Sequence, residues 1–244
     1  MDNLEERGYQ GPIITSAEAT GTDLQAFMTN VFSWMTGALM ITAFTAYGFA
    51  SQESLFSLLY TPTGGHSVLG WVAMLAPLGI VIAMGAALQR LSYMSLMLLF
   101  IGFSVIMGIS MSYIFYTYAA STIYQTFFIT AATFGTMAVL GYTTKTDLTK
   151  FGRLLFMGLI GIILAMVVNW FLGSSQLDYI ISIIGVLVFT GLTAYDVQRL
   201  KRIGLSIPGG TEIAGKAAIM GALSLYLDFI NLFLMLLRLF GGRD

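Results

Sequence analysis

Seven long apolar segments, separated by short polar connections, dominate the pattern of the chain. They cover residues 27–50, 68–88, 91–115, 119–141, 154–172, 179–195 and 217–237. Each is close to the roughly 20 residues that an α-helix needs to cross about 30 Å of hydrocarbon. Backbone polar groups in lipid need hydrogen-bond partners within the protein, which helices and closed β-barrels provide. The alternation of apolar and polar residues and the regular turns of a membrane β-barrel are absent. The pattern therefore predicts an all-α membrane protein, a seven-transmembrane helix bundle.

The third and fourth segments are joined by an apolar connection. Residues 91–144 contain no charged side chain, and this stretch is too long for a single membrane-crossing helix. The chain must turn back within it, and we expect the turn around residues 116–121.

Short polar segments at the two ends of the chain flank a single predicted transmembrane domain. The first 26 residues are polar and lack the basic start and short apolar core of a signal peptide. We expect a polar cytoplasmic tail over residues 1–26, a single seven-span transmembrane domain over residues 27–240 and a short external C-terminus over residues 241–244. No convincing internal repeat is present.

Positive charges occur in alternate connections between the segments. The connections after the second, fourth and sixth segments carry Arg90, then Lys145, Lys150 and Arg153, then Arg199, Lys201, Arg202 and Lys216. The connections after the first, third and fifth segments carry no Lys or Arg. Cytoplasmic loops are enriched in these residues, so the N-terminus is expected inside and the C-terminus outside.

Composition supports the membrane assignment and narrows the function. Hydrophobic residues make up 57% of the chain and charged residues 9%, whereas a soluble domain carries about 25% charge. The net charge of −1 argues against a nucleic-acid-binding protein, which would need a basic face. The absence of cysteine excludes disulfides and thiol catalysis, and the single histidine, His66, cannot build a multi-histidine metal site.

Asp228 is the one charged residue in the middle of an apolar segment. It lies roughly 17 Å from the start of that segment, near half the hydrocarbon thickness. A carboxylate there costs about 2.5–3.5 kcal/mol, so it normally has a partner and a function. A stripe at helical spacing surrounds it and should face the bundle interior. The stripe consists of Gly221, Ser224, Asp228, Asn231 and Met235. Alternatively, Asp228 only clamps helices through hydrogen bonds to Tyr, Ser or Asn neighbours.

Asp196, near the end of the sixth segment, is the candidate partner of Asp228. It lies about 7 Å before Lys201 along a helix, which places it one or two turns inside the membrane boundary. Asp228 is expected near the middle of the membrane, so the two depths do not match perfectly. Arg199 is three residues further along, and an Asp/Arg pair at that spacing often bridges on one helix face. Arg90, at the end of the second segment, is either a functional contact or a boundary residue that extends to the membrane surface.

Two carboxyl groups that meet inside a membrane would share a proton and titrate as a unit. Such a pair is either a proton-linked latch or a transient site for Ca²⁺, which prefers oxygen ligands. No lysine lies within a predicted span, which excludes a retinal Schiff base, and no HExxH, P-loop or dinucleotide motif is present. We therefore expect no catalytic residues, no cofactor and a protein that is not an enzyme.

Two motifs resemble the signature of a known family. They are LTAYDVQ at 192–198 and ALSLYLDFINLF at 222–233, the latter followed by LLR at 236–238. They resemble the Bax inhibitor-1 family of TMBIM-type membrane proteins, in particular its bacterial, YccA-like branch. The resemblance covers roughly residues 25–240 and implies a bundle in which a central seventh helix is wrapped by the other six.

The resemblance also implies a location and a function. Its bacterial members lie in the cytoplasmic (inner) membrane, in contact with lipid. The family is associated with a pH-sensitive calcium leak, and its gating aspartate pair corresponds to Asp196 and Asp228. An arginine that is linked to the latch in a bacterial relative corresponds to Arg90. Arg199, Ser224 and Asn231, which spacing along the helices places near the two acids, are expected as supporting polar residues. Some relatives carry an acid where this chain has Gly79, and the 203–216 connection is longer than expected.

Two functions follow from these expectations. The first is a pH-sensitive calcium leak channel, with calcium ions or protons as its partners. In one version low pH latches the protonated pair, and in another protonation weakens an arginine latch. The alternative is a membrane interaction protein that modulates a membrane-anchored quality-control protease, with the tail over residues 1–26 as a contact.

Overall fold

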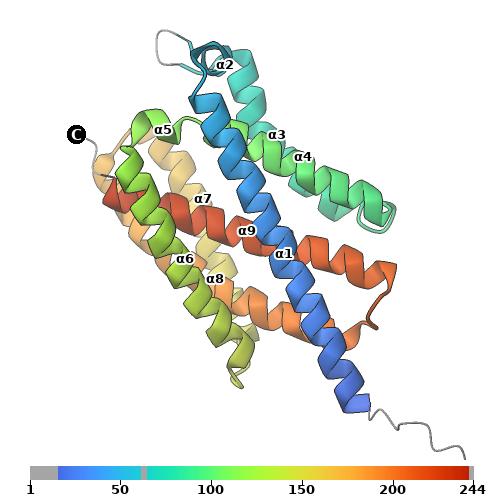
Figure 1. Ribbon diagram of the computed structural model, residues 1–244. Helices are drawn as coiled ribbons and strands as arrows, with labels where there is room; N and C mark the ends of the chain where they lie inside the picture. The colour runs from blue at the N-terminus through green and yellow to red at the C-terminus, as the bar shows by residue number, and fades with distance from the viewer. Residues whose placement is uncertain (1–15, 62–64, 242–244) are drawn as a thin grey trace, which may run out of the picture.

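The computed structural model describes residues 16–61 and 65–241, and within these ranges the secondary structure is helical apart from one isolated β-bridge between Tyr60 and His66 (Figure 1). The helices are α1 (Ser16–Ala50), α2 (Glu53–Leu59), α3 (Val68–Ala86), α4 (Tyr93–Met111), α5 (Ile114–Thr117), α6 (Ala120–Thr143), α7 (Thr149–Leu172), α8 (Ser175–Ser206) and α9 (Glu212–Phe240). Among the described residues, seven segments are long and apolar enough to cross a membrane, with α4 and α5 together forming the third over Tyr93–Thr117. The predicted class, an all-α multi-pass membrane protein, is confirmed.

The turn expected around residues 116–121 is present. α5 ends at Thr117, and Tyr118 has an extended backbone with φ −125° and ψ 145°. α6 starts at Ala120, so the charge-free stretch does divide into two antiparallel spans.

Two helices extend beyond the apolar segments that predict them. α1 begins at Ser16, inside the region expected as a polar tail, whereas residues 1–15 of that tail lie outside the described residues. α8 continues past residue 195 to Ser206. Hydropathy falls at the first charges, but Arg and Lys are good helix formers, so the helix continues. The expected C-terminal segment 241–244 lies outside the described residues except for Gly241.

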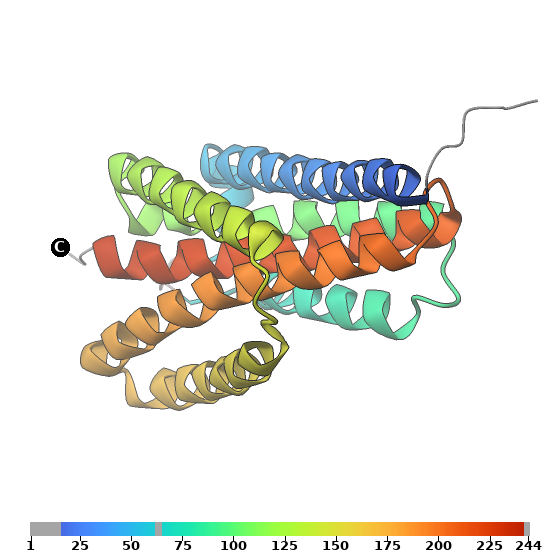
Figure 2. The same ribbon diagram turned by 90° about the horizontal axis from the view of Figure 1, so that it is seen from below.

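α9, the seventh span, lies at the centre of the bundle as expected. Of its most apolar stretch 72% is buried inside the protein, against 6% for α7. Figure 2 shows α9 running through the middle, with α1 and α4 on one side and α8 on the other. α7 packs mainly on α8, so most of its surface remains for lipid.

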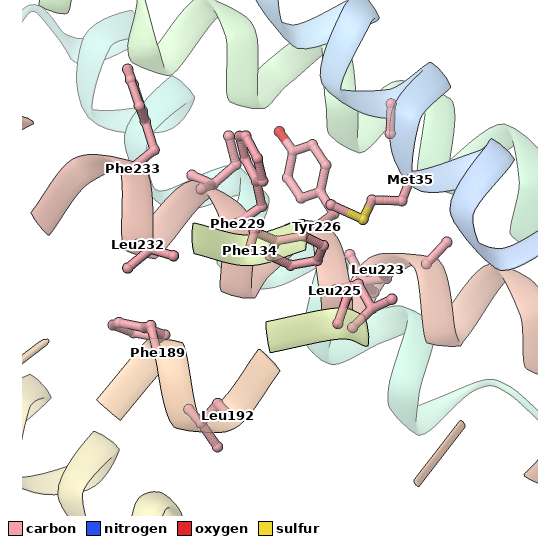
Figure 3. Close-up of a cluster of buried hydrophobic side chains, with 14 of the residues drawn as sticks. Met35, Phe134, Phe189, Leu192, Leu223, Leu225, Tyr226, Phe229, Leu232 and Phe233 are labelled. Atoms are coloured by element: carbon pink, nitrogen blue, oxygen red, sulfur yellow. The ribbon is translucent and has the colours of Figure 1, made fainter. Parts of the chain in front are cut away.

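Aromatic side chains fill the core around α9 (Figure 3). The Tyr226 and Phe103 rings meet edge to face with centroids 5.3 Å apart, and Phe229 meets Phe134 in the same way at 5.5 Å. Such pairs add about 0.5–1.5 kcal/mol to their apolar burial. They attach α9 to α4 on one side and to α6 on another.

The backbone of α6 approaches that of α8 at Gly141. A Cβ atom there would lie 2.2 Å from the carbonyl oxygen of Ala194, so a larger residue would push the two helices apart. Close approach through small residues is a common way to pack membrane helices. The contact holds α6 beside the part of α8 that carries Asp196.

The connections that contain the basic residues gather at one end of the bundle, which we name the basic end. The α8–α9 connection and the start of α1 lie there at the lower right of Figure 1, with the α3–α4 connection above them and the α6–α7 connection to their left. Lys201 Nζ donates to the Tyr142 carbonyl at 2.8 Å, and Tyr93 N donates to Glu212 Oε1 at 3.2 Å. α2, α5 and the end of α9 lie at the opposite end, which we name the Arg238 end.

Candidate functional site

Asp196 and Asp228 face each other between α8 and α9. Both are buried, with 7% and 6% of their surfaces exposed. About 15 Å of helix separates Asp196 from the end of α8 at Ser206, because α8 extends far beyond its predicted end. About 24 Å of helix separates Asp228 from the start of α9 at Glu212, so the ends of the two helices are offset and the two acids meet in spite of the depth mismatch expected from the sequence. Leu200, one turn beyond Asp196, packs against Gly221, about two turns before Asp228, and this contact fixes the register of the two helices.

The two carboxyl groups lie within side-chain hydrogen-bonding reach of each other. Asp196 Oδ1 and Asp228 Oδ2 are buried and have no hydrogen-bond partner among the described residues. Two full negative charges this close in a protein interior repel strongly, whereas one shared proton joins the two groups. The geometry can therefore hold a proton between α8 and α9, and it leaves two carboxyl oxygens without a hydrogen bond.

Arg199 pairs with one of the two acids, Asp196. Its Nη1 lies 3.8 Å from Asp196 Oδ1, which is too long for a hydrogen bond, and its side chain is 52% exposed. The sequence left open whether Asp196 is the partner of Asp228 or of Arg199, and in the structure it contacts both. Asp196 contacts Asp228 in the bundle and forms a loose ion pair on its own helix.

The structure does not bring Arg90 to the aspartates. Arg90 is exposed beyond the end of α3, and it forms no ion pair with any residue in the described ranges. In this arrangement it has the environment of a boundary residue.

The polar stripe of α9 divides between two faces. Asp228 and Met235 are buried against α8, where Met235 packs on Gly185. Ser224 and Asn231 are only partly buried, and Asn231 Nδ2 donates to the Leu227 carbonyl of its own helix at 2.8 Å. Neither polar side chain hydrogen-bonds Asp228 in the part of the chain described. The prediction that the whole stripe faces the bundle interior is therefore only partly correct. α9 has neighbouring helices on several sides, so its buried surface is not confined to one stripe.

Gln198 is a structural neighbour of the site that sequence reasoning missed. Its Oε1 accepts from Leu148 N at 2.9 Å, and its Nε2 donates to the Thr146 carbonyl at 2.7 Å. Both backbone groups belong to the α6–α7 connection. The side chain thus attaches this connection to α8 two residues beyond Asp196.

Asp147 completes this attachment. The Thr149 hydroxyl donates to Asp147 Oδ1 at 2.6 Å, and Arg202 of α8 pairs with the same oxygen. The Thr149 hydroxyl, then Arg202, then the Thr149 backbone N–H hold the pKa of the Asp147 carboxyl well below its usual range. Asp147 and Thr149 form a recognisable turn motif, but nothing local in the sequence points to Arg202 as a partner.

A buried acid on a central last span, opposite a second acid on the preceding span, is the arrangement expected of the Bax inhibitor-1 family. Residues 24–244 match the family model described as "Inhibitor of apoptosis-promoting Bax1", and the chain belongs to this family of multi-pass membrane proteins. The resemblance read from the two motifs is confirmed.

Several bacterial proteins are similar to the chain over most of its length. It is 47% identical over 221 residues to "Inner membrane protein YbhL" of Escherichia coli K12, covering 90% of this chain and 93% of YbhL. It is 43% identical over 217 residues to a protein of Borreliella burgdorferi, covering 89% and 92% of the two chains. A protein of Caulobacter vibrioides is 37% identical over 243 residues, covering 97% of each.

Proposed function

We propose that this chain is a pH-sensitive calcium leak channel gated by Asp196 and Asp228. The observation that carries the proposal is the direct approach of two buried carboxyl groups between the two most buried spans. Lys and Arg favour the cytoplasmic side, so the basic end is cytoplasmic in this proposal. The similarity to an inner membrane protein supports the bacterial inner membrane as its location.

The proton shared by the two aspartates acts as the latch. When it is present, Asp196 and Asp228 attract each other and hold α8 against α9. When the pH rises and the proton leaves, two anions face each other in a medium that screens charge poorly, so the helices separate. A cation that enters between them neutralises this repulsion, and this is how the same pair conducts.

Calcium is the cation that the oxygen ligands suit best. It takes 6–8 oxygen ligands, and two carboxylates supply at most four. The described residues contain no group of three or more His, Cys, Asp or Glu side chains that could hold a metal ion. Water and backbone carbonyls would complete the shell, which favours transient occupancy during passage over tight storage.

Calcium flux into liposomes with an internal indicator tests the channel. We expect wild-type flux to rise between about pH 5.5 and pH 8, and Asp228→Asn and Asp196→Asn to show low flux without this rise, since asparagine cannot become an anion. Glu212→Gln, a change of an exposed acid at the start of α9, is the matched control and should keep the pH response. A response identical in all four proteins would exclude gating by the pair.

A groove between α1 and α6 supports the second candidate, an interaction protein that modulates a membrane-anchored quality-control protease. The groove has a volume of about 790 Å³. Thr29, Ser33 and Thr36 of α1 line it, are exposed, and form no hydrogen bond within the described residues. Hydroxyl groups and small residues on a membrane-facing surface favour the docking of another transmembrane helix.

A bulky side chain placed in this groove distinguishes the interaction protein from the calcium channel. With the protease co-expressed, Ser33→Trp should abolish its modulation while calcium flux stays at the wild-type level. Phe151→Trp, at an exposed position of α7, is the control. Unchanged modulation in Ser33→Trp would exclude the groove as the contact.

A further inference from the structure

A second pair of charges joins α8 and α9 at the Arg238 end of the bundle. Asp178 lies in the first turn of α8 and Arg238 in the last turn of α9, where each charge suits the helix dipole. Arg238 Nη1 lies 3.6 Å from Asp178 Oδ1, and the side chains are 28% and 43% exposed. This distance is too long for a hydrogen bond. Both groups therefore remain able to bind a ligand of the opposite charge.

A cavity of about 550 Å³ opens beside this pair between α3 and α7. Asn169 of α7 also lines it, and its Oδ1 accepts from Ser174 N at 3.1 Å. The Asn169 amide N–H₂ forms no hydrogen bond within the described residues and is free to donate. The polar part of the cavity thus combines two donors, the guanidinium and the amide, with the Asp178 carboxylate as acceptor and the imidazole of His66 on the α3 side.

Two tryptophans mark the level of the membrane surface at this cavity. Trp71 of α3 and Trp170 of α7 line it, with ring centroids 5.9 Å apart. Tryptophan is enriched where the lipid headgroups meet the hydrocarbon. The charged pair therefore lies at headgroup level.

The rest of the cavity wall is apolar and continues toward the membrane interior. Met74 of α3 and Ile163 and Val167 of α7 line it and are exposed by 40%, 49% and 50%. α3 packs mainly on α4, and α7 mainly on α8, so the space between α3 and α7 opens to lipid. Figure 2 shows these two helices on the same side of the bundle, below α8 and α9. One cavity thus has a charged end and an apolar end, which is the shape of a site for an amphiphile.

We propose that this cavity binds one phospholipid with an ethanolamine headgroup, from the leaflet at the Arg238 end. Arg238 and Asn169 donate to the lipid phosphate, and Asp178 accepts from its ammonium group. Trp71 and Trp170 lie against the glycerol region, and an acyl chain follows Ile163 and Val167. Asp178 discriminates against phosphoglycerol lipids, which carry a phosphate but offer no cation to the carboxylate. The site lies apart from the aspartate pair and does not depend on ion conduction.

Native mass spectrometry of the purified full-length chain tests this proposal. The protein is titrated with phosphatidylethanolamine and phosphatidylglycerol that have identical acyl chains. We expect the wild type to bind the ethanolamine lipid more tightly. Arg238→Gln should weaken the binding of both lipids by about tenfold, the effect of losing one charge-assisted hydrogen bond. Asp178→Asn should abolish the preference while keeping the binding of phosphatidylglycerol.

Two further variants make the result decisive. Arg153→Gln removes an exposed arginine at the opposite end of α7 and should bind lipid as the wild type does. Ile163→Trp fills the apolar part without touching the charges and should weaken both lipids equally, which keeps the test valid if Arg238→Gln fails to fold. Equal binding of the two lipids by the wild type, a preference for phosphatidylglycerol, or Arg238→Gln behaving as Arg153→Gln would each overturn the proposal.

Discussion

Tyr226 joins three helices through its hydroxyl group. The hydroxyl lies 2.7 Å from Thr42 Oγ1 of α1, and Thr42 Oγ1 donates to the Ser104 carbonyl of α4 at 2.9 Å. Since the Thr42 proton is used there, Tyr226 is the donor to Thr42. Tyr226 and Asp228 are two positions apart, about 200° around the helix at 3.6 residues per turn, so they point to nearly opposite sides of α9. Tyr226 thus anchors α9 to α1 and α4, while Asp228 faces α8.

Tyr226→Phe should destabilise the protein by about 1 kcal/mol, the net value of one buried hydrogen bond, without removing aromatic packing. Thermal or denaturant unfolding of the purified protein measures this change. Tyr179→Phe is the control, because Tyr179 lies on α8 with 57% of its surface exposed. Equal stability of Tyr226→Phe and the wild type would mean that the hydrogen bond contributes nothing to anchoring α9.

At the scale of the elements, the contact between α6 and α8 depends on backbone approach at a single position. Gly141 meets the carbonyl oxygen of Ala194, two residues before Asp196. A rigid contact here keeps α8 in place while its other side faces α9. The helices α6 and α8 therefore act as a support for the aspartate pair.

Gly141→Ala should cost about 1–3 kcal/mol, the usual penalty of overpacking, because the new methyl group meets backbone that cannot rotate away. Gly135→Ala on the same helix is the matched control, since a Cβ there meets nothing within 4 Å. It should leave the protein as stable as the wild type, or up to about 1 kcal/mol more stable through helix propensity. Unfolding midpoints of both variants give the comparison, and equal losses would show that the contact is not tight.

At the scale of the whole molecule, the sequence predicts what depends on local pattern. The seven spans follow from apolar length, and the turn at Tyr118 from the excess length of one uncharged stretch. The true end of α8 at Ser206 could not be predicted, because hydropathy falls from Asp196 onward although helix propensity does not. The partners of Asp147 and Gln198 could not be predicted either, because they lie about fifty residues away along the chain.

The attachment of the α6–α7 connection and the aspartate pair should respond differently to pH. The pKa of the Asp147 carboxyl is lowered by the Thr149 hydroxyl and Arg202. Its stabilisation is therefore complete above the unfolded pKa of about 3.9 and is lost only as the pH falls through the lower folded pKa. Between about pH 5 and pH 8, Asp147→Asn should lower the melting temperature by a constant amount.

The calcium flux of the same variant completes this prediction. If the pH response belongs to Asp196 and Asp228, Asp147→Asn should keep it, because Asp147 stays ionised throughout this range and loses no proton. Asp228→Asn should lose it. Melting curves and liposome flux measured at four pH values across the range give both results. A pH response lost in Asp147→Asn but kept in Asp228→Asn would move the gate from the centre of the bundle to its basic end.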